Sequence, residues 1–316
     1  MKSKLAIIGY GSIGMRHAEI LKNNFIIRVF SKRKHKNKKK ISFFDNINEC
    51  LDGCDFAFIC SNTSEHINHI NICLKKNIHI YCEKPISNNL YGINNLPKKK
   101  FFNKCQIYLG YQLRFDYLIL KAKKIIEEKK FGKLLHYRGF VGQNLTTWRQ
   151  NIHYTKSNSF SKEKGGGVLL ELIHDLDLIF YLLSEIKFFS GFSSRILFKN
   201  SDVEDIASIN FKTKSGVVGN IFLDMVSPFH KREIQLTFEK KTLNLDLVNS
   251  TISEISNKKN YKSHIINNDR NKIFLRCHND FFKKTKLKSF TKLNNTTISH
   301  NQKLLRIINS VKSKYI

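Results

Sequence analysis

The sequence lacks long hydrophobic runs. No stretch of about 18 apolar residues occurs, so a membrane-spanning helix is not expected. Residues 1–8 show neither the apolar core nor the cleavage-site pattern of a signal peptide, and we therefore expect a cytoplasmic protein. With 316 residues, 41% of them hydrophobic, the chain is long enough for one or two domains with substantial cores.

The sequence also lacks the cysteine spacing of a metal site. Seven cysteines are scattered along the chain, and none belongs to a Cys-x-x-Cys arrangement. No metal site is predicted, and most of the cysteines are expected to be small buried hydrophobic residues.

Acidic residues are scarce, with 25 Asp and Glu against 55 Lys and Arg, which gives a formal net charge of +30. Clustered basic residues neutralise phosphates, so nucleic-acid binding is a remote alternative. The basic residues are nevertheless spread along the chain, and the densest run, KRKHKNKKK at 32–40, is also typical of a solvated loop. The charge fits an anionic substrate such as a nucleotide sugar, and equally a composition biased towards Lys, Asn and Ile.

The amino-terminal residues contain a dinucleotide-binding pattern. The apolar run KLAII is followed by GYGSIG, which places Gly9, Gly11 and Gly14 in G-x-G-x-x-G spacing, and then by helix-like residues. These glycines allow a tight turn, close approach of a pyrophosphate and close packing of helix on strand, while the helix amino terminus holds the anion. With Ser12 and Ile13 in the same loop, the pattern predicts a Rossmann domain that binds NAD or NADP.

The end of the second predicted strand, FIIRVF, bears on the choice of dinucleotide. An acidic residue about 20 positions beyond the glycines would bind the ribose 2′-hydroxyl of NAD. Ser31, Lys32 and Arg33 stand there instead and offer a hydroxyl and two cations. They favour the 2′-phosphate of NADP over NAD, unless Lys32 and Arg33 merely begin the basic loop.

The next segment alternates strand and helix, which is typical of a parallel sheet whose ligands gather at the carboxyl ends of the strands. Ser61 and Asn62 follow the strand-like CDFAFIC, and Glu83 and Lys84 follow IHIYC, so we expect all four beside the cofactor. Lys84 would then lie near the nicotinamide. Pro85, one of only three prolines, restricts the backbone that presents Lys84, and a cis Lys-Pro bond is compatible with this role.

A buried helix in the second half carries polar residues. After the glycines at 165–167, the run VLLELIHDLDLIFYLL is apolar nearly all round, yet it contains Glu171 and His174. Residues three apart share a helix face, so the two side chains are expected to point towards one spot. Burying a carboxylate and an imidazole is costly without a partner or a purpose.

These motifs resemble, in order, those of the Gfo/Idh/MocA oxidoreductases. The resemblance rests on GYGSIGMRH, EKP, LGYQLRF at 109–115, GGGVLLELIHDLDL at 165–178 and the closing NQKLLRIINSVK. It implies an α/β protein with a Rossmann domain at 1–115, followed at 116–316 by an α+β domain built on a large, open, mostly antiparallel sheet. The last helix, at about 299–314, would be able to pack back on the first domain.

The resemblance also implies an NAD(P)-dependent oxidoreductase that moves hydride between nicotinamide and a hydroxyl or keto carbon of a sugar or nucleotide sugar, in a homodimer or homotetramer. Alcohol oxidation needs a base whose pKa is near the working pH, and His174 is the candidate. Lys84 would stabilise the developing alkoxide, and Glu171 would orient the pair. A catalytically silent, cofactor-binding regulatory protein of the same fold is the alternative, although intact Lys84 and His174 argue against it.

Two positions depart from the usual family pattern, because an Asp is expected where Glu171 stands and the histidine usually follows four residues later, not three. The branch found in surface-polysaccharide and nonulosonic-acid sugar clusters is more similar, on GYQLRF and TTWRQ. We therefore expect a role in the biosynthesis of surface-polysaccharide sugars.

Substrate contacts are expected from Lys84, His174 and four further residues. Arg114 follows the GYQ strand near the expected junction of the domains, where it would bind cofactor or substrate. Trp148 can stack on a sugar and Arg149 can clamp a carboxylate or phosphate, or they can merely anchor a loop and face water. Tyr154, in the same polar segment, is a weaker candidate.

Overall fold

The structure is a computed structural model that describes residues 2–96, 102–148, 153–256, 262–265, 269–287 and 290–312. It divides into two compact units. The first contains Met1–Tyr111 and Leu275–Leu305, and the second contains Gln112–Phe274 and Arg306–Ile316.

The first unit is built on a six-stranded parallel sheet in the order β3-β2-β1-β4-β5-β6. This is the Rossmann order, in which the strand order reverses beside β1 and creates a ligand-binding edge. In β1, Leu5 to Ile8 are fully buried, as expected for a central parallel strand covered on both faces. The strands are β1 Lys4–Ile8, β2 Ile26–Phe30, β3 Ile41–Phe44, β4 Phe56–Ile59, β5 His79–Cys82 and β6 Ile107–Leu109.

Helices complete this unit, and two of them come from the carboxyl-terminal part of the chain. Phe281, in α9, contacts the rings of Phe58 and Tyr81 on the sheet. Asn294, in α10, donates to the carbonyl oxygens of Phe102 and Cys105. The helices are α1 Ser12–Leu21, α2 Ile47–Leu51, η1 Thr63–Glu65, α3 His66–Lys75, α4 Leu90–Asn94, α9 Arg270–Lys284 and α10 Thr291–Lys312. The first residues of α9, 270–274, and the last residues of α10, 306–312, group with the second unit.

The division of the chain into two compact units therefore differs from the expected domain boundary at residue 115. Residues 275–305 group with the first unit because aromatic packing and the Asn294 hydrogen bonds join them to it. A helix that packs back on the first domain was expected only from about residue 299.

The second unit is built on an eight-stranded sheet in the order β14-β13-β12-β11-β7-β10-β9-β8. All neighbouring pairs are antiparallel except β7 and β10, so the prediction of a large, open, mostly antiparallel sheet is confirmed. The strands are β7 Leu134–Gly142, β8 Ile186–Ser194, β9 Ile206–Thr213, β10 Val218–Asp224, β11 Lys231–Phe238, β12 Thr242–Asp246, β13 Thr251–Ile255 and β14 Lys262–Ile265.

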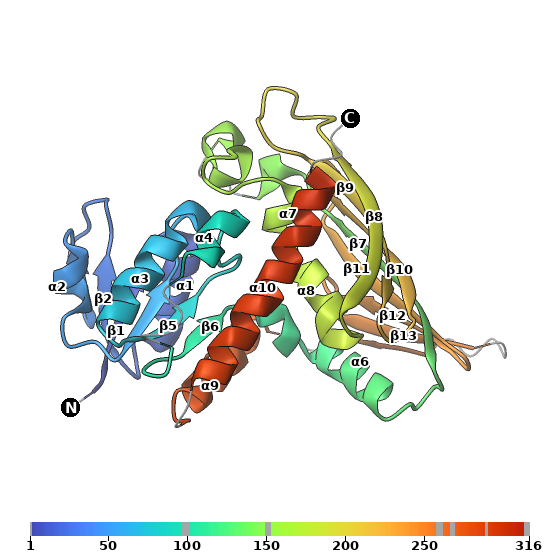
Figure 1. Ribbon diagram of the computed structural model, residues 1–316, viewed down its shortest axis with the longest axis horizontal. Helices are drawn as coiled ribbons and strands as arrows, with labels where there is room; N and C mark the ends of the chain where they lie inside the picture. The colour runs from blue at the N-terminus through green and yellow to red at the C-terminus, as the bar shows by residue number, and fades with distance from the viewer. Residues whose placement is uncertain are drawn as a thin grey trace. The chain divides into compact units, whose positions relative to one another are not determined.

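The two faces of this sheet differ. Along β10, Gly219, Ile221 and Leu223 are buried, whereas Val218 and Phe222 are exposed. Helices α7 (Val168–Glu171) and α8 (Ile173–Leu182) lie along one face (Figure 1), and α6 (Tyr117–Glu127) packs against α8. The short helices η2 Gln112–Phe115, η3 Leu145–Thr147, η4 Tyr154–Lys156 and η5 Asn158–Phe160 occupy the connecting segments.

Candidate active site

The glycine turn after β1 has the geometry that its motif predicts. Gly9 has a φ of +95°, and a Cβ there would lie 2.8 Å from the backbone of Cys60 and Ser61. A Cβ on Gly14 would lie 2.1 Å from the carbonyl oxygen of Gly9, whereas one on Gly11 would meet nothing within 4 Å. Gly11 is also the residue that precedes α1, and no side chain caps that helix. An open backbone at a helix amino terminus therefore fits the pyrophosphate of a dinucleotide.

The residues after β2 form a turn in which Arg33 donates its backbone N–H to the Ser31 hydroxyl, at 3.1 Å. The Lys32 ammonium lies 2.6 Å from the Glu65 carboxylate at the end of η1. Glu65 was not expected here, because 33 residues separate it from Lys32. Lys32, one of the two cations expected to bind a 2′-phosphate, is therefore already paired with a carboxylate.

Two histidines of α3 hold the residues that follow β4. The Ser61 hydroxyl lies 2.9 Å from Nδ1 of His69, and the Ser61 carbonyl oxygen lies 3.1 Å from Nε2 of His66. Burial lowers the pKa of His69 to about 4, so its ring is neutral near pH 7. The Ser61 side chain is therefore held by His69, and Asn62 directly precedes η1.

The Glu-Lys-Pro step follows β5 at the same edge of the sheet. The Lys84-Pro85 peptide bond is cis. Glu83 is buried, and its carboxylate accepts a hydrogen bond from Nε2 of His17, at 2.9 Å. Glu83 was expected beside the cofactor, but its carboxylate is bound by a buried histidine. His17 was not anticipated, although it ends the GYGSIGMRH motif.

In the second unit, the expected single helix around His174 is broken. It ends at Glu171 in α7 and restarts at Ile173 in α8, with Leu172 (φ −98°, ψ 21°) between them. Glu171 and His174 therefore stand on two consecutive helices, and not on the single helix that was expected. Glu171 accepts a hydrogen bond from the Ser159 hydroxyl at 2.5 Å, and His174 is buried in the first turn of α8.

The acidic residues of α8 are engaged in ion pairs. Nε of Arg114 donates to Asp177 at 2.7 Å, and Nη2 of Arg114 donates to the other oxygen of the same carboxylate. Asp175 lies 3.2 Å from the guanidinium of Arg232 in β11. Arg114, expected to bind cofactor or substrate, therefore also joins the segment after β6 to the helix that carries His174.

Of the residues between β7 and α7 that were expected to contact substrate, the structure describes Trp148 and Tyr154. Trp148 donates its indole N–H to the carbonyl oxygen of Gln143 at 3.0 Å, which anchors its loop. The Tyr154 ring packs on Phe160 and Phe198, with ring centroids 5.6 and 5.3 Å away. Arg149 lies outside the described residues.

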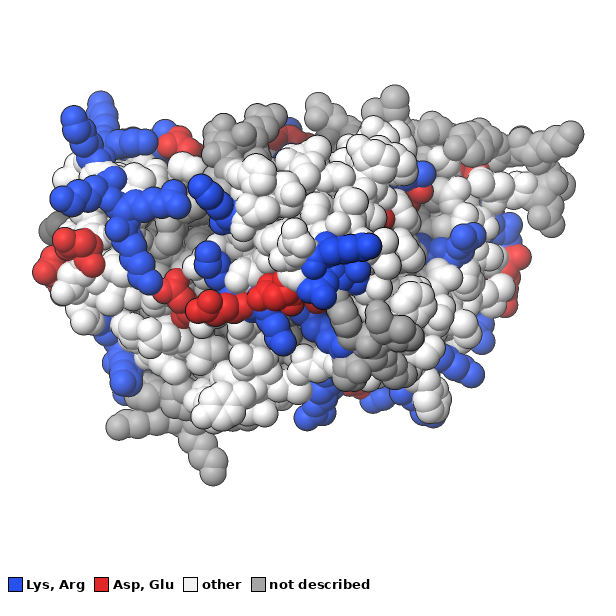
Figure 2. All heavy atoms as spheres, turned by 90° about the horizontal axis from the view of Figure 1, so that it is seen from above, with Lys and Arg blue, Asp and Glu red and all other residues white. Residues whose placement is uncertain are grey.

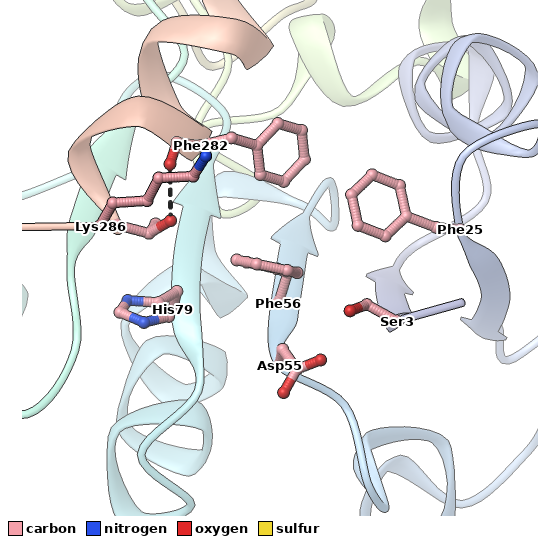
Figure 3. Close-up of a pocket in the computed structure, with 8 residues that line it drawn as sticks. Ser3, Phe25, Asp55, Phe56, His79, Phe282 and Lys286 are labelled. Carbon is pink, nitrogen blue, oxygen red and sulfur yellow. Dashed lines mark hydrogen bonds between the residues drawn. The ribbon is translucent and has the colours of Figure 1, made fainter. Parts of the chain in front are cut away.

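A pocket of about 550 Å³ lies at the opposite edge of the Rossmann sheet (Figure 3). Asp55 precedes β4 and His79 begins β5, so this pocket is at the amino ends of the strands, away from the glycine turn and Lys84. The pocket is not the dinucleotide site. It is lined by Ser3, Phe25, Asp55, Phe56, His79, Phe282, Thr285 and Lys286.

The structure also bears on metal binding, on membrane spans and on surface charge. All seven cysteines are buried, as expected, and the described residues contain no group of three or more His, Cys, Asp or Glu arranged to hold a metal ion. No helix in the described part of the chain is both long and apolar enough to cross a membrane. On the face drawn in Figure 2, Lys and Arg form several groups separated by uncharged and acidic surface, not one continuous patch.

Comparison with protein families identifies the class to which this fold and these motifs belong. Residues 3–111 match the sequence model of the oxidoreductase family with an NAD-binding Rossmann fold, and residues 119–244 match that of the GFO/IDH/MocA C-terminal domain. The chain therefore belongs to the Gfo/Idh/MocA family of oxidoreductases.

The curated relatives include dehydrogenases of polyols and sugars. Myo-inositol 2-dehydrogenase of Thermotoga maritima is 27% identical over 235 residues, which cover 69% of this chain and 67% of that protein. Glucose-6-phosphate 3-dehydrogenase of Bacillus subtilis is 24% identical over 188 residues, 57% of this chain and 53% of that protein. The chain thus spans about two thirds of the first relative and about half of the second.

Solved structures share the fold over nearly the whole chain. Levoglucosan dehydrogenase in complex with NADH has a TM-score of 0.82 at 14% identity, covering 98% of this chain and 96% of that chain. UDP-N-acetylglucosamine 3-dehydrogenase from Acidithiobacillus ferrooxidans has a TM-score of 0.76 at 15% identity, covering 100% of this chain and 98% of that chain. At these identities the similarity shows the fold.

Proposed function

We propose that this protein is an NAD(P)-dependent dehydrogenase or reductase that acts on a CH-OH or keto carbon of a sugar or nucleotide sugar. The observation that carries the proposal is the position of Lys84 at the carboxyl edge of a Rossmann sheet whose glycine turn has the conformation of a dinucleotide site. The names of the curated relatives support the sugar class.

The cofactor would be held by residues of the first unit. We assign the pyrophosphate to the backbone of Gly9 to Gly14, including Ser12 and Ile13 in the first turn of α1. Ser61, Asn62 and the backbone at Glu83 would line the nicotinamide half, and Arg114 remains a candidate contact. When bound, the nicotinamide accepts or donates hydride.

Ser31, Lys32 and Arg33 support NADP as the preferred cofactor, with NAD as the alternative. A 2′-phosphate carries more negative charge than a 2′-hydroxyl and is therefore favoured by neighbouring cations. The Lys32 ion pair with Glu65 weakens this preference, because the carboxylate neutralises one cation.

Three side chains have chemical roles in the proposal. Lys84 holds the reacting oxygen and stabilises negative charge that develops on it. His174 accepts the hydroxyl proton during oxidation and returns it during reduction. Glu171, bonded to Ser159, orients this base.

We assign substrate recognition to Arg114, Trp148, Arg149 and Tyr154, besides Lys84 and His174. The GYQLRF and TTWRQ segments support a role in forming sugars for surface polysaccharides. The apolar outer face of the large sheet, with Phe222 and Val218 exposed, supports a homodimer or homotetramer.

The test begins with cofactor binding. Purified protein is titrated with NADH and with NADPH, and nicotinamide fluorescence is followed. Micromolar affinity for either supports the proposal, and the preferred cofactor is then offered with myo-inositol, glucose 6-phosphate and UDP-N-acetylglucosamine while nicotinamide absorbance is recorded. Absence of binding to both cofactors overturns the proposal.

A further inference from the structure

The two residues that flank Lys84 are each bound by a buried histidine. On one side, the Glu83 carboxylate accepts from Nε2 of His17 at 2.9 Å. On the other, the Pro85 carbonyl oxygen accepts from Nδ1 of His66 at 2.8 Å. His17 is fully buried and His66 is 1% exposed, so water does not compete for these bonds.

His17 is itself held in one orientation. Its Nδ1 lies 2.8 Å from Nε2 of His278 in α9, and its ring contacts the rings of Phe58 and Tyr81. Burial and the neighbouring His17 lower the pKa of His278 well below its usual range, so His278 is neutral. A carboxylate only accepts hydrogen bonds, so His17 carries a proton on Nε2 and donates it to Glu83.

His66 also lies beside the residue that follows the neighbouring strand. Its second ring nitrogen, Nε2, lies 3.1 Å from the carbonyl oxygen of Ser61, which follows β4. Burial lowers the pKa of His66, although both backbone contacts act in the opposite direction. A neutral ring donates from one nitrogen only, and the shorter contact assigns that proton to Nδ1 and the Pro85 carbonyl.

We propose that His17 and His66 are positioning residues for Lys84, which hold the backbone on both sides of it so that the ammonium is presented at the cofactor edge. This inference rests on the role that the proposed function gives to Lys84. Neither histidine acts on substrate or cofactor. Displacing a reacting group by about 1 Å can lower a rate by about 100-fold, so two fixed flanking residues are a physical means of maintaining the rate.

The test measures the reactivity of the Lys84 amine directly and needs no substrate. The full chain is labelled with trace acetic anhydride over a range of pH, and acetylation of Lys84 is quantified by mass spectrometry relative to Lys75, an exposed lysine at the end of α3. His17→Phe and His66→Phe remove the donors at similar volume. His17→Gln and His66→Asn retain an amide donor near Nε2 and Nδ1, respectively. His79→Asn is the control, because His79 begins the strand that ends before Lys84.

We expect each phenylalanine variant to change the Lys84 labelling rate by at least about threefold or to shift its pH midpoint, while the amide variants and His79→Asn match the parent protein. Unchanged Lys84 labelling in folded phenylalanine variants would overturn the proposal and leave the histidines a structural role. Where circular dichroism shows that a phenylalanine variant is unfolded, the serine variant at that position replaces it.

This outcome is separable from that of the proposed function. If neither NADH nor NADPH binds, the oxidoreductase proposal fails, whereas the labelling of Lys84 still reports whether the histidines position it. If a cofactor does bind, a positioning role also predicts that its Kd stays within about threefold in the variants while kcat falls by about tenfold or more.

Discussion

Arg114 and Asp177 form a two-nitrogen ion pair that links the segment after β6 to the helix of His174. The Asp177 side chain is 1% exposed and that of Arg114 is 30% exposed. The pair therefore lies at the boundary between surface and interior, where removing one partner takes the opposite charge away from a buried or half-buried group.

We expect Asp177→Asn and Arg114→Met each to lower the free energy of unfolding by roughly 3 kcal/mol. The double variant should lose less than the sum, because the coupling between the partners is counted in both single variants. Urea denaturation of all four proteins measures this. Additive losses would mean that the pair contributes no coupling, and would leave Arg114 to a cofactor or substrate role alone.

Two glycines of the turn after β1 are expected to differ in role: Gly14 in the fold and Gly11 in dinucleotide binding. A Cβ at Gly14 would collide with the Gly9 carbonyl oxygen, so Gly14→Ala should destabilise the fold by about 2 kcal/mol or more. A Cβ at Gly11 meets no protein atom within 4 Å, so Gly11→Ala should remain as stable as the parent protein and bind NADH and NADPH at least about tenfold more weakly. Thermal melting and fluorescence titration of both variants check this, and normal dinucleotide affinity in Gly11→Ala would contradict the assignment.

The chemical roles proposed for His174 and Lys84 predict that replacing either residue lowers kcat without weakening cofactor binding. His174→Asn should lower kcat by about 10²- to 10⁴-fold, the usual effect of removing a general base. Lys84→Met should lower it by about 10²- to 10³-fold, because a charge that stabilises the developing alkoxide is lost. Lys75→Met, at an exposed position, is the matched control. Steady-state kinetics on whichever sugar proves active, with cofactor Kd from fluorescence, distinguish these effects from misfolding.

Cofactor preference should respond to the Lys32 and Glu65 pair. Glu65→Gln frees Lys32 from its carboxylate and should strengthen NADPH binding roughly three- to tenfold, with little effect on NADH. Lys32→Met should weaken NADPH binding by a similar factor. Because both groups are partly exposed, these differences should shrink as salt is added. Equal effects of each variant on the two cofactors would place the 2′-phosphate elsewhere.

Buried histidines predict a loss of stability in acid. The folded pKa of His69 is about 4, below its usual value near 6.5, so the unfolded chain binds the extra proton first as the pH falls. Neutral His69 therefore contributes on the order of 2 kcal/mol to the free energy of unfolding, after allowance for solvent. This contribution is present above about pH 6.5 and is lost as the pH falls towards 4. Urea denaturation at several pH values should show a shallower acid loss for His69→Asn. The exposed His35→Asn is the control, and parallel curves for all three proteins would contradict the assignment.

Much of the fold and part of the site follow from local sequence. The G-x-G-x-x-G spacing and the alternation of strand and helix up to Cys82 predicted the first sheet, because turn chemistry and hydrophobic period act over a few residues. The position of Lys84 at the carboxyl edge followed from the same reasoning. The large antiparallel sheet of the second half was expected from the family resemblance.

Tertiary structure decided what depends on residues far apart in the chain. Packing on the first sheet assigns residues 275–305 to that unit, and the break at Leu172 separates Glu171 from His174 although the apolar run is continuous. His17 meets Glu83 across 66 residues and His278 across 261, and no local pattern encodes such partners. The sequence by itself predicted which residues would bear the chemistry, because motif spacing is local. Only the folded chain determined which side chains hold them, because a buried polar group takes its partner from whatever element packs against it.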